Sequence, residues 1–91
     1  MNENEYRAYF PARARAAIGV LNRAGFDAYF VGGCVRDFYM NHTPHDFDIT
    51  TNAKSEDILR CFEREGLRAY PKGGACGTVG VGHADEEVEI T

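Results

Sequence analysis

Long apolar segments are missing from this 91-residue sequence. No stretch approaches the roughly 20 residues that a membrane-spanning helix needs, so the sequence predicts no such helix. Residues 1–5 carry two acids and lack an apolar core, which is typical of neither a secretory signal nor a basic transit peptide. A hydrophobic content of 44% and a charged content of 26% instead predict one small soluble domain with a modest core.

An excess of basic residues is also missing. The net charge is −4 and the pI is about 5.2. A small domain that binds nucleic acid over its own surface is usually basic. We therefore expect any grip on RNA to depend on regions outside this chain, whereas a local group of acids suits a metal site better.

Cysteines are few and widely separated. The three are Cys34, Cys61 and Cys76, and no CxxC pair occurs. This spacing gives little support to a zinc ribbon or a thioredoxin-like redox site. We expect three reduced, mostly buried thiols of a cytosolic (cytoplasmic) protein.

The apolar spacing and the turn residues predict alternating helices and strands. We expect helices over 11–24, over 34–40 with a left-handed stop at Asn41, and from Ser55, as N-cap, to a stop at Gly66. We expect strands over 26–31, 46–50, 67–70, 78–81 and 88–91. Residues 1–9 are expected to fray or to form an extra helical turn. This order predicts an α/β (α+β) domain with one mixed sheet and flanking helices.

Two glycines, Gly32 and Gly33, stand between an expected strand and an expected helix. Bare backbone at such a joint lets N–H groups approach an anion, typically a phosphate. Arg36, about one turn later, is able to make bidentate contacts with phosphate oxygens. A Gly-Gly pair at such a joint more often reflects plain turn geometry, so both interpretations stay open on these residues alone.

Two acids, Asp46 and Asp48, stand one residue apart in an expected strand. Side chains at i and i+2 of a strand point to the same face, with Cα atoms roughly 6.5–7 Å apart. Such carboxylates can converge on a hard cation such as Mg²⁺ or Mn²⁺. The alternative is an edge strand with a solvated acidic face. In either case Phe47 and Ile49 are expected to pack inward.

Several other polar residues have weaker signals. Glu89 can join the two acids if its strand lies beside theirs, but its spacing alone favours a solvent-facing position. Residues 85–87 are most simply a solvated acidic turn. His42, His45 and Asp46 form a weak candidate zinc site, and Lys72 is expected in a loop before Gly77.

Four segments taken together resemble the head domain of the class II tRNA nucleotidyltransferases. These are the CCA-adding enzymes and their bacterial poly(A) polymerase relatives, in the polymerase-β-like superfamily. The segments are Asp27-Ala28-Tyr29-Phe30-Val31-Gly32-Gly33-Cys34-Val35-Arg36-Asp37, Asp46-Phe47-Asp48-Ile49-Thr50-Thr51, Gly77-Thr78-Val79 and Glu87-Val88-Glu89-Ile90-Thr91. The resemblance implies a partial head domain over 10–91, truncated at its C-terminal end, preceded by an extension over 1–9.

The resemblance also implies a role for each matching residue. Gly32, Gly33 and Arg36 would hold the triphosphate of ATP or CTP, and Asp37 would orient Arg36 or the turn. Asp46 and Asp48 would bind Mg²⁺, with Mn²⁺ possible, and Glu89 would be the third catalytic acid. The implied reaction is attack of the 3′-oxygen of tRNA or another RNA on the α-phosphorus, adding CCA, C or A.

The sequence departs from the family pattern at two positions, Asn41 in place of a usual glycine and Cys76 in place of a common histidine. It also lacks the family's later Arg-Arg-Asp-Phe motif, its neck region that selects the base, and its tRNA-holding body and tail. We therefore expect a fragment that is inactive on its own. The alternatives are a poly(A) polymerase head, a nucleotide- and metal-binding module without turnover, and a structural domain whose acids form only a polar face.

Overall fold

The computed structural model describes residues 2–42, 46–73, 77–82 and 87–91, and these contain four helices and five strands in the order α1-α2-β1-α3-β2-α4-β3-β4-β5. The helices are α1 (Glu3–Tyr9), α2 (Ala12–Arg23), α3 (Gly33–Tyr39) and α4 (Ser55–Arg64). The strands are β1 (Ala28–Val31), β2 (Phe47–Thr51), β3 (Ala69–Gly73), β4 (Thr78–Val81) and β5 (Val88–Ile90). Within these described residues, no helix has the length and apolar character that crossing a membrane requires.

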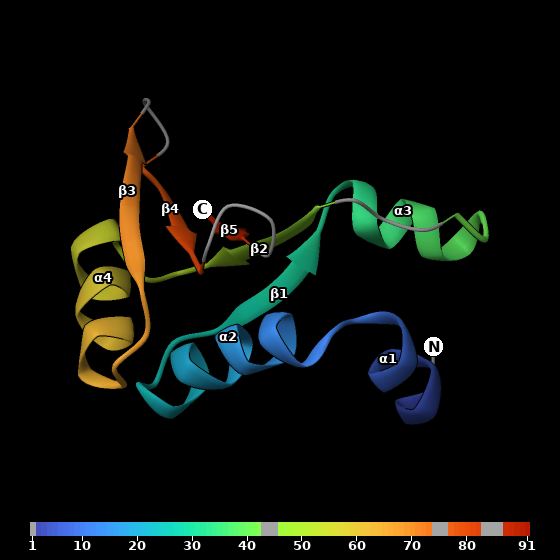
Figure 1. The fold of residues 1–91 in the computed structure, drawn as a ribbon, viewed down its shortest axis with the longest axis horizontal. Helices are drawn as coiled ribbons and strands as arrows, with labels where there is room; N and C mark the ends of the chain where they lie inside the picture. Colours follow the sequence, from blue (N-terminus) through green and yellow to red (C-terminus); the bar gives the residue numbers. More distant parts are fainter. Residues whose placement is uncertain (1, 43–45, 74–76, 83–86) are drawn as a thin grey trace.

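The five strands form one mixed sheet in the order β1-β2-β5-β4-β3 (Figure 1). Strands β2 and β5 pair in parallel, and the other three pairs are antiparallel. A parallel neighbour needs a long crossover, and here the crossover contains α4, β3 and β4. The late strand β5 is thereby inserted in the middle of the sheet, next to β2. The predicted fold class, one mixed sheet with flanking helices, is confirmed.

The two faces of the sheet differ in polarity. Phe47 and Ile49 of β2 are buried, as predicted, together with Val88 and Ile90 of β5. Helix α2 contacts β1 and β2, α4 contacts β3 and β4, and the two helices touch each other over this apolar face (Figure 1). Because side chains alternate along a strand, the intervening residues of β2 and β5 project from the opposite face. Tyr29 of β1, which is 63% exposed, also marks this second face as open.

Glycine and asparagine end three of the helices in left-handed backbone. The φ angles are 92° at Gly25 after α2, 57° at Asn41 after α3 and 73° at Gly66 after α4. Glycine adopts this region without a steric penalty, and asparagine tolerates it better than most residues. The predicted stops at Asn41 and Gly66 are confirmed.

The predicted cap of α4 is wrong. The cap position is Lys54, which makes no side-chain capping hydrogen bond, and Ser55 is the first helical residue. The Ser55 hydroxyl instead donates to the backbone carbonyl of Gly77, 2.7 Å away. The Ser55 hydroxyl therefore makes a long-range tertiary contact instead of the helix-capping hydrogen bond that the local sequence predicts.

Residues 3–9 form a capped helix, so the extra helical turn expected as one possibility is present and the frayed alternative is wrong. Asn2 and Glu5 make a reciprocal capping box at the start of α1. Just beyond α1, Phe10 stacks on Phe30 of β1 with ring centroids 3.9 Å apart. The Tyr9 hydroxyl donates to the carbonyl of Cys34 at 2.6 Å. The boundary between an extension over 1–9 and a head domain over 10–91 stays a prediction.

Two of the three cysteines behave as predicted. Cys34 and Cys61 are buried and free of disulfides. Cys76 lies outside the described residues. Both described thiols belong to the apolar core, which confirms a packing role for them.

Candidate functional site

The candidate acids come together because β5 lies beside β2. Asp48 of β2 and Glu89 of β5 are direct partners in the parallel pair, so both side chains project from the open face. Asp48 is half-buried, and the Glu89 side chain is 43% exposed. Asp46 is exposed just before the start of β2. Glu89 was expected to join Asp46 and Asp48 only if its strand lies beside theirs. The pairing of β5 with β2 meets this condition.

The acids disturb one another electrostatically. Burial raises the pKa of the Asp48 carboxyl, and the charges of Glu89 and Asp46 and a hydrogen bond with Glu89 raise it further. Neighbouring carboxylates that must all ionise are destabilising unless a positive charge compensates them. Among the described residues, no group of three or more His, Cys, Asp or Glu side chains is arranged as a metal-binding cluster.

The Gly32-Gly33 turn lies against these acids. Strand β1 runs antiparallel to β2, and Val31 pairs with Asp48, so the turn that follows Val31 begins beside the acid. A β-carbon placed on Gly32 would lie 3.4 Å from Asp48 Oδ2. Gly32 has φ 80° and ψ −146°, a backbone conformation that is open essentially to glycine alone. Glycine is therefore needed at position 32 for its backbone conformation as well as for the close approach of the carboxylate.

Arg36 lies on the other side of the same turn. A β-carbon placed on Gly33 would lie 3.5 Å from Arg36 Nη2, so the guanidinium folds back toward the start of α3. The Arg36 side chain is 73% exposed, and its Nε is 4.0 Å from Asp37 Oδ1. The turn is thus flanked by the carboxylate of Asp48 and the guanidinium of Arg36.

Asp37 is the more buried member of the Arg36–Asp37 pair, with 21% of its side chain exposed. His42 Nδ1 lies 3.9 Å from Asp37 Oδ1. Of the weak zinc candidate formed by His42, His45 and Asp46, His45 falls outside the described residues. Among the described residues, His42 thus pairs with Asp37, on the helix that precedes it. The role of Asp37 stays a prediction.

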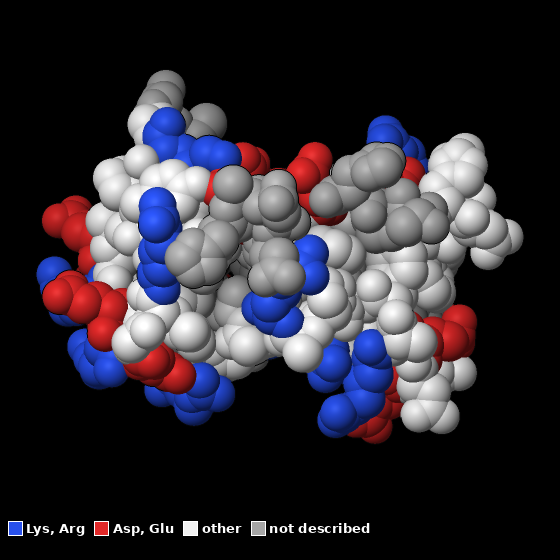
Figure 2. All heavy atoms as spheres, viewed as in Figure 1, with Lys and Arg blue, Asp and Glu red and all other residues white. Residues whose placement is uncertain are grey.

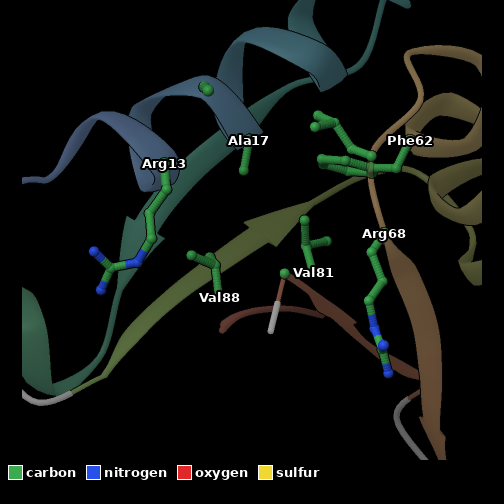
Figure 3. A pocket seen from close by; sticks show the side chains of 9 residues that line it. Arg13, Ala17, Phe62, Arg68, Val81 and Val88 are labelled. Carbon is green, nitrogen blue, oxygen red and sulfur yellow. The ribbon is translucent and has the colours of Figure 1, made fainter. Parts of the chain in front are cut away.

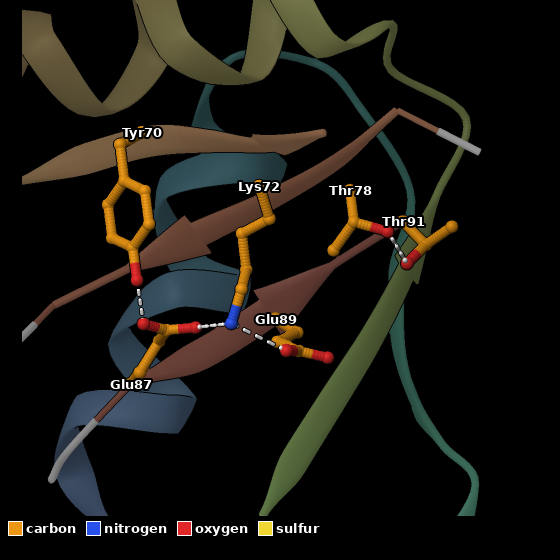
Figure 4. A network of polar contacts seen from close by, with 6 residues as sticks. All are labelled: Tyr70, Lys72, Thr78, Glu87, Glu89 and Thr91. Atoms are coloured by element: carbon orange, nitrogen blue, oxygen red, sulfur yellow. Dashed lines mark hydrogen bonds and ion pairs between the residues drawn. The ribbon is translucent and has the colours of Figure 1, made fainter. Parts of the chain in front are cut away.

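A polar network that the sequence did not predict joins Glu89 to β3 (Figure 4). Lys72 Nζ bonds Glu89 Oε1 at 2.8 Å and also pairs with Glu87, whose other oxygen accepts a hydrogen bond from the Tyr70 hydroxyl. Lys72 stands on β3, so the loop expected there begins later than predicted. The solvated turn is wrong for Glu87, whose side chain is only 13% exposed; residues 85 and 86 are outside the described residues. The alternation Glu87-Val88-Glu89 was the signal that places both acids on one face.

A pocket on the helix-covered side of the sheet is separate from these acids (Figure 3). It is lined by Arg13, Ala16, Ala17, Phe62, Leu67, Arg68, Val81, Gly82 and Val88. Val88, the first residue of β5, stands between Glu87 and Glu89 in the sequence and is buried on the opposite face. None of the predicted site residues lines this pocket, so it belongs to the core side and not to the candidate site.

The surface carries charges of both signs. On the face shown in Figure 2, the described Lys and Arg side chains are interspersed with Asp and Glu side chains. This agrees with the net charge of −4. The described part of this face therefore presents no broad basic surface of the kind that binds a nucleic acid backbone.

Known proteins of similar sequence show which family the chain belongs to. Residues 28–91 match the family described as the poly(A) polymerase head domain. The chain belongs to this family. Two curated relatives of this head domain are a CCA-adding enzyme of Staphylococcus haemolyticus and poly(A) polymerase I of Haemophilus influenzae. The first is 39% identical over 79 residues, which cover 87% of this chain and 19% of the enzyme. The second is 45% identical over 56 residues, which cover 62% and 12%.

Solved structures of CCA-adding enzymes share the fold of this chain. The Bacillus stearothermophilus CCA-adding enzyme in complex with CTP superposes with a TM-score of 0.73 and 34% identity, over the whole chain and 20% of the enzyme. A CCA-adding enzyme in complex with ATP has a TM-score of 0.75 at 16% identity, which supports the fold alone. The chain thus spans about a fifth of the length of the CCA-adding enzymes of S. haemolyticus and B. stearothermophilus. The predicted resemblance to this nucleotidyltransferase head is confirmed.

Proposed function

We propose that this head domain supplies the catalytic acids and the triphosphate site of a template-independent RNA nucleotidyltransferase. The observation that carries the proposal is the pairing of Asp48 with Glu89 directly beside the Gly32 turn. The acids and the glycine turn come from three different strands, and the fold brings them to one end of the open face. A sheet with a merely solvated polar face has no need of this convergence.

The nucleotide is proposed to bind at the Gly32-Gly33 turn. Its triphosphate would lie against the bare backbone of the turn, with the exposed guanidinium of Arg36 as its charge partner. Asp37 would keep Arg36 in position through the contact of 4.0 Å between them. ATP and CTP are the proposed nucleotides, since related CCA-adding enzymes have been solved with each of them.

The donor set at the acids fits a hard divalent cation. Mg²⁺ commonly binds through one or two carboxylates together with substrate phosphates, and does not require an all-protein cage. Asp46 and Asp48 provide such carboxylates, and a bound cation would offset the burial and the neighbouring charges of Glu89 and Asp46 that raise the pKa of Asp48. We therefore assign Mg²⁺, or Mn²⁺, to Asp46 and Asp48, with Glu89 as the neighbouring third acid.

The chain's residues would mainly position the reactants and balance their charge. The RNA 3′-oxygen attacks the α-phosphorus of the nucleotide, the new phosphodiester bond forms, and the bond to pyrophosphate breaks. When bound, the metal ion supplies positive charge that favours the ionised 3′-hydroxyl and the leaving pyrophosphate. Asp46 and Asp48 hold that charge at the reacting end of the nucleotide, while Arg36 holds the triphosphate in line.

Two products are consistent with the family. CCA addition is favoured by the CCA-adding enzyme of S. haemolyticus, whose match covers 87% of the chain. Poly(A) addition is favoured by the higher identity, 45%, to poly(A) polymerase I over a shorter region. The tRNA or other RNA partner would be held mainly outside this head, because the head itself has a net charge of −4.

The test measures nucleotide transfer to RNA by the full-length protein that contains this chain. Asp46→Ala and Asp48→Ala should each abolish Mg²⁺-dependent extension of a labelled tRNA lacking its 3′ end, with an unchanged circular dichroism spectrum. Asp27→Ala, an exposed acid beside the other end of β1, is the matched control and should retain activity. Transfer that survives in both acid variants would reject the metal assignment. Products with CTP and ATP, separately and together, distinguish CCA, C, A and poly(A) addition.

A further inference from the structure

The side chain of Lys72 extends from the edge strand β3 across β4 and forms an ion pair with Glu89 on β5. Lys72 stands on β3, whereas its two partners are Glu89 in β5 and Glu87, which directly precedes β5 (Figure 4). Strand β4 lies between them, and there Gly80 pairs with Tyr70 on one side and with Glu89 on the other. A β-carbon on Gly80 would lie 2.9 Å from Tyr70 Cζ and 3.0 Å from Glu87 Oε1. Because Gly80 has no side chain, Tyr70 and Lys72 of β3 can extend over β4 and contact Glu87 and Glu89.

The two ion pairs of Lys72 are not equivalent. Glu87 is 13% exposed and also accepts the Tyr70 hydroxyl, whereas Glu89 is 43% exposed and stands beside Asp48. An ion pair between exposed groups is weak and easily exchanged. Breaking a more buried pair leaves a charge without compensation, which is costly. Glu87 is therefore the lasting partner of Lys72, and Glu89 is the exchangeable one.

We propose that Lys72 is a positioning residue that acts as a counter-ion for Glu89 and gives Glu89 up when a divalent cation binds the acids. This inference rests on the proposed function, which assigns the cation to Asp46 and Asp48. Without the cation, Lys72 neutralises Glu89 and limits the repulsion between Glu89 and Asp48. With the cation, Lys72 keeps its pair with Glu87, and Glu89 turns its charge to the metal.

If Lys72 exchanges in this way, neutralising Lys72 and neutralising Glu87 should have opposite effects on the affinity of the acids for a cation. Removing the Lys72 charge removes a competitor for Glu89, so the acids should bind a cation more tightly. Neutralising Glu87 removes the alternative partner of Lys72, so Lys72 should stay on Glu89 and the cation should bind more weakly. A residue that merely supports the fold would weaken binding in both cases.

The experiment measures Mn²⁺ binding to the 91-residue chain by electron paramagnetic resonance of the free ion, with folding checked by circular dichroism. Lys72→Met should tighten binding about three- to tenfold, the size expected for removing one partly screened charge near a divalent ion. Arg60→Met is the matched control, because Arg60 is an exposed cation of α4 paired with Asp57. Glu87→Gln should weaken binding, and Glu63→Gln, an exposed acid of the same helix, is its control.

The double variant Lys72→Met/Glu87→Gln completes a thermodynamic cycle. The effect of Glu87→Gln should be smaller in it than in the parent chain, because Lys72 is no longer present to be released. Equal or weaker Mn²⁺ binding by Lys72→Met, or additive effects in the double variant, would overturn the counter-ion role. If Lys72→Met fails to fold, an unchanged affinity in Glu87→Gln relative to its control overturns the role by itself.

Asp48→Asn separates this inference from the proposed function. Binding that depends on Asp48 but not on Lys72 would reject the counter-ion role and leave the metal assignment in place. Binding that does not depend on Asp48 would reject the metal assignment, and the counter-ion role with it.

Discussion

Asp48 and Glu89, which are 41 positions apart in the sequence, are direct cross-strand partners in the parallel pair β2–β5. Like charges placed opposite each other in a sheet are destabilising. The pKa of Asp48 is raised by burial and by these neighbouring acids, so the folded domain carries an electrostatic penalty at neutral pH. A cation bound at the proposed site, beside the Gly32 turn, would relieve this penalty.

Replacing Asp48 should therefore stabilise the domain in a pH-dependent way. A raised pKa means that the folded state binds the proton more tightly than the unfolded state, so stability is lost as the pH rises through the raised value. Asp48→Asn removes this loss. It should be more stable than the parent chain at pH 7, and the difference should shrink as the pH falls toward the ordinary aspartate range.

Urea unfolding at pH 7 and near pH 4, with and without Mg²⁺, measures this difference. Mg²⁺ should stabilise the parent chain more than Asp48→Asn, because a ligand stabilises only the state that binds it. Asp27→Asn provides the effect of the same substitution outside the acid group. A stability difference that is independent of pH would contradict the assigned origin of the pKa shift.

Arg36→Ala should weaken nucleotide binding and leave metal binding unchanged. The guanidinium lies over the Gly33 turn and is largely exposed, so its loss removes a phosphate partner without disturbing the core. Titration with ATP or CTP, followed by NMR shifts of the Gly32 and Gly33 amides, measures the change, and Mn²⁺ binding without nucleotide serves as the comparison. Nucleotide affinity equal to that of the parent chain would reject the role of Arg36.

Gly80→Ala should destabilise the domain by about 1–3 kcal/mol, the usual cost of an added methylene in a filled space. The new methyl would meet the Tyr70 ring and the Glu87 carboxylate, so the network of Lys72 should be disturbed as well. Thermal and urea unfolding give the stability, and Mn²⁺ binding reports the network.

Gly19→Ala is the matched control for Gly80→Ala. Its methyl would lie 3.2 Å from the flexible end of Arg23 within α2, and alanine gains roughly 0.5–1 kcal/mol over glycine in a helix interior. The same chemical change should thus be stabilising at position 19. Equal stability changes at the two glycines would show that the space at Gly80 is not limiting.

Local patterns in the sequence were enough to predict the elements. The helices over 11–24 and 34–40, the left-handed stop at Asn41 and the inward packing of Phe47 and Ile49 follow from periodicity and turn chemistry, which depend only on neighbouring residues. The failures share one cause. Ser55 was assigned to a helix cap, and Glu87 to a solvated turn, because their actual partners, Gly77 and Tyr70, are 22 and 17 residues away.

The sequence by itself determined which residues are available for chemistry: a glycine turn, an arginine one turn later, and acids that alternate with buried apolar residues. Only the tertiary structure decided which of them meet. The parallel insertion of β5 beside β2 places Glu89 next to Asp48, and the glycine at position 80 lets Lys72 reach across β4. Strand order and register are set by the burial of whole faces and by long crossovers, which no local pattern specifies.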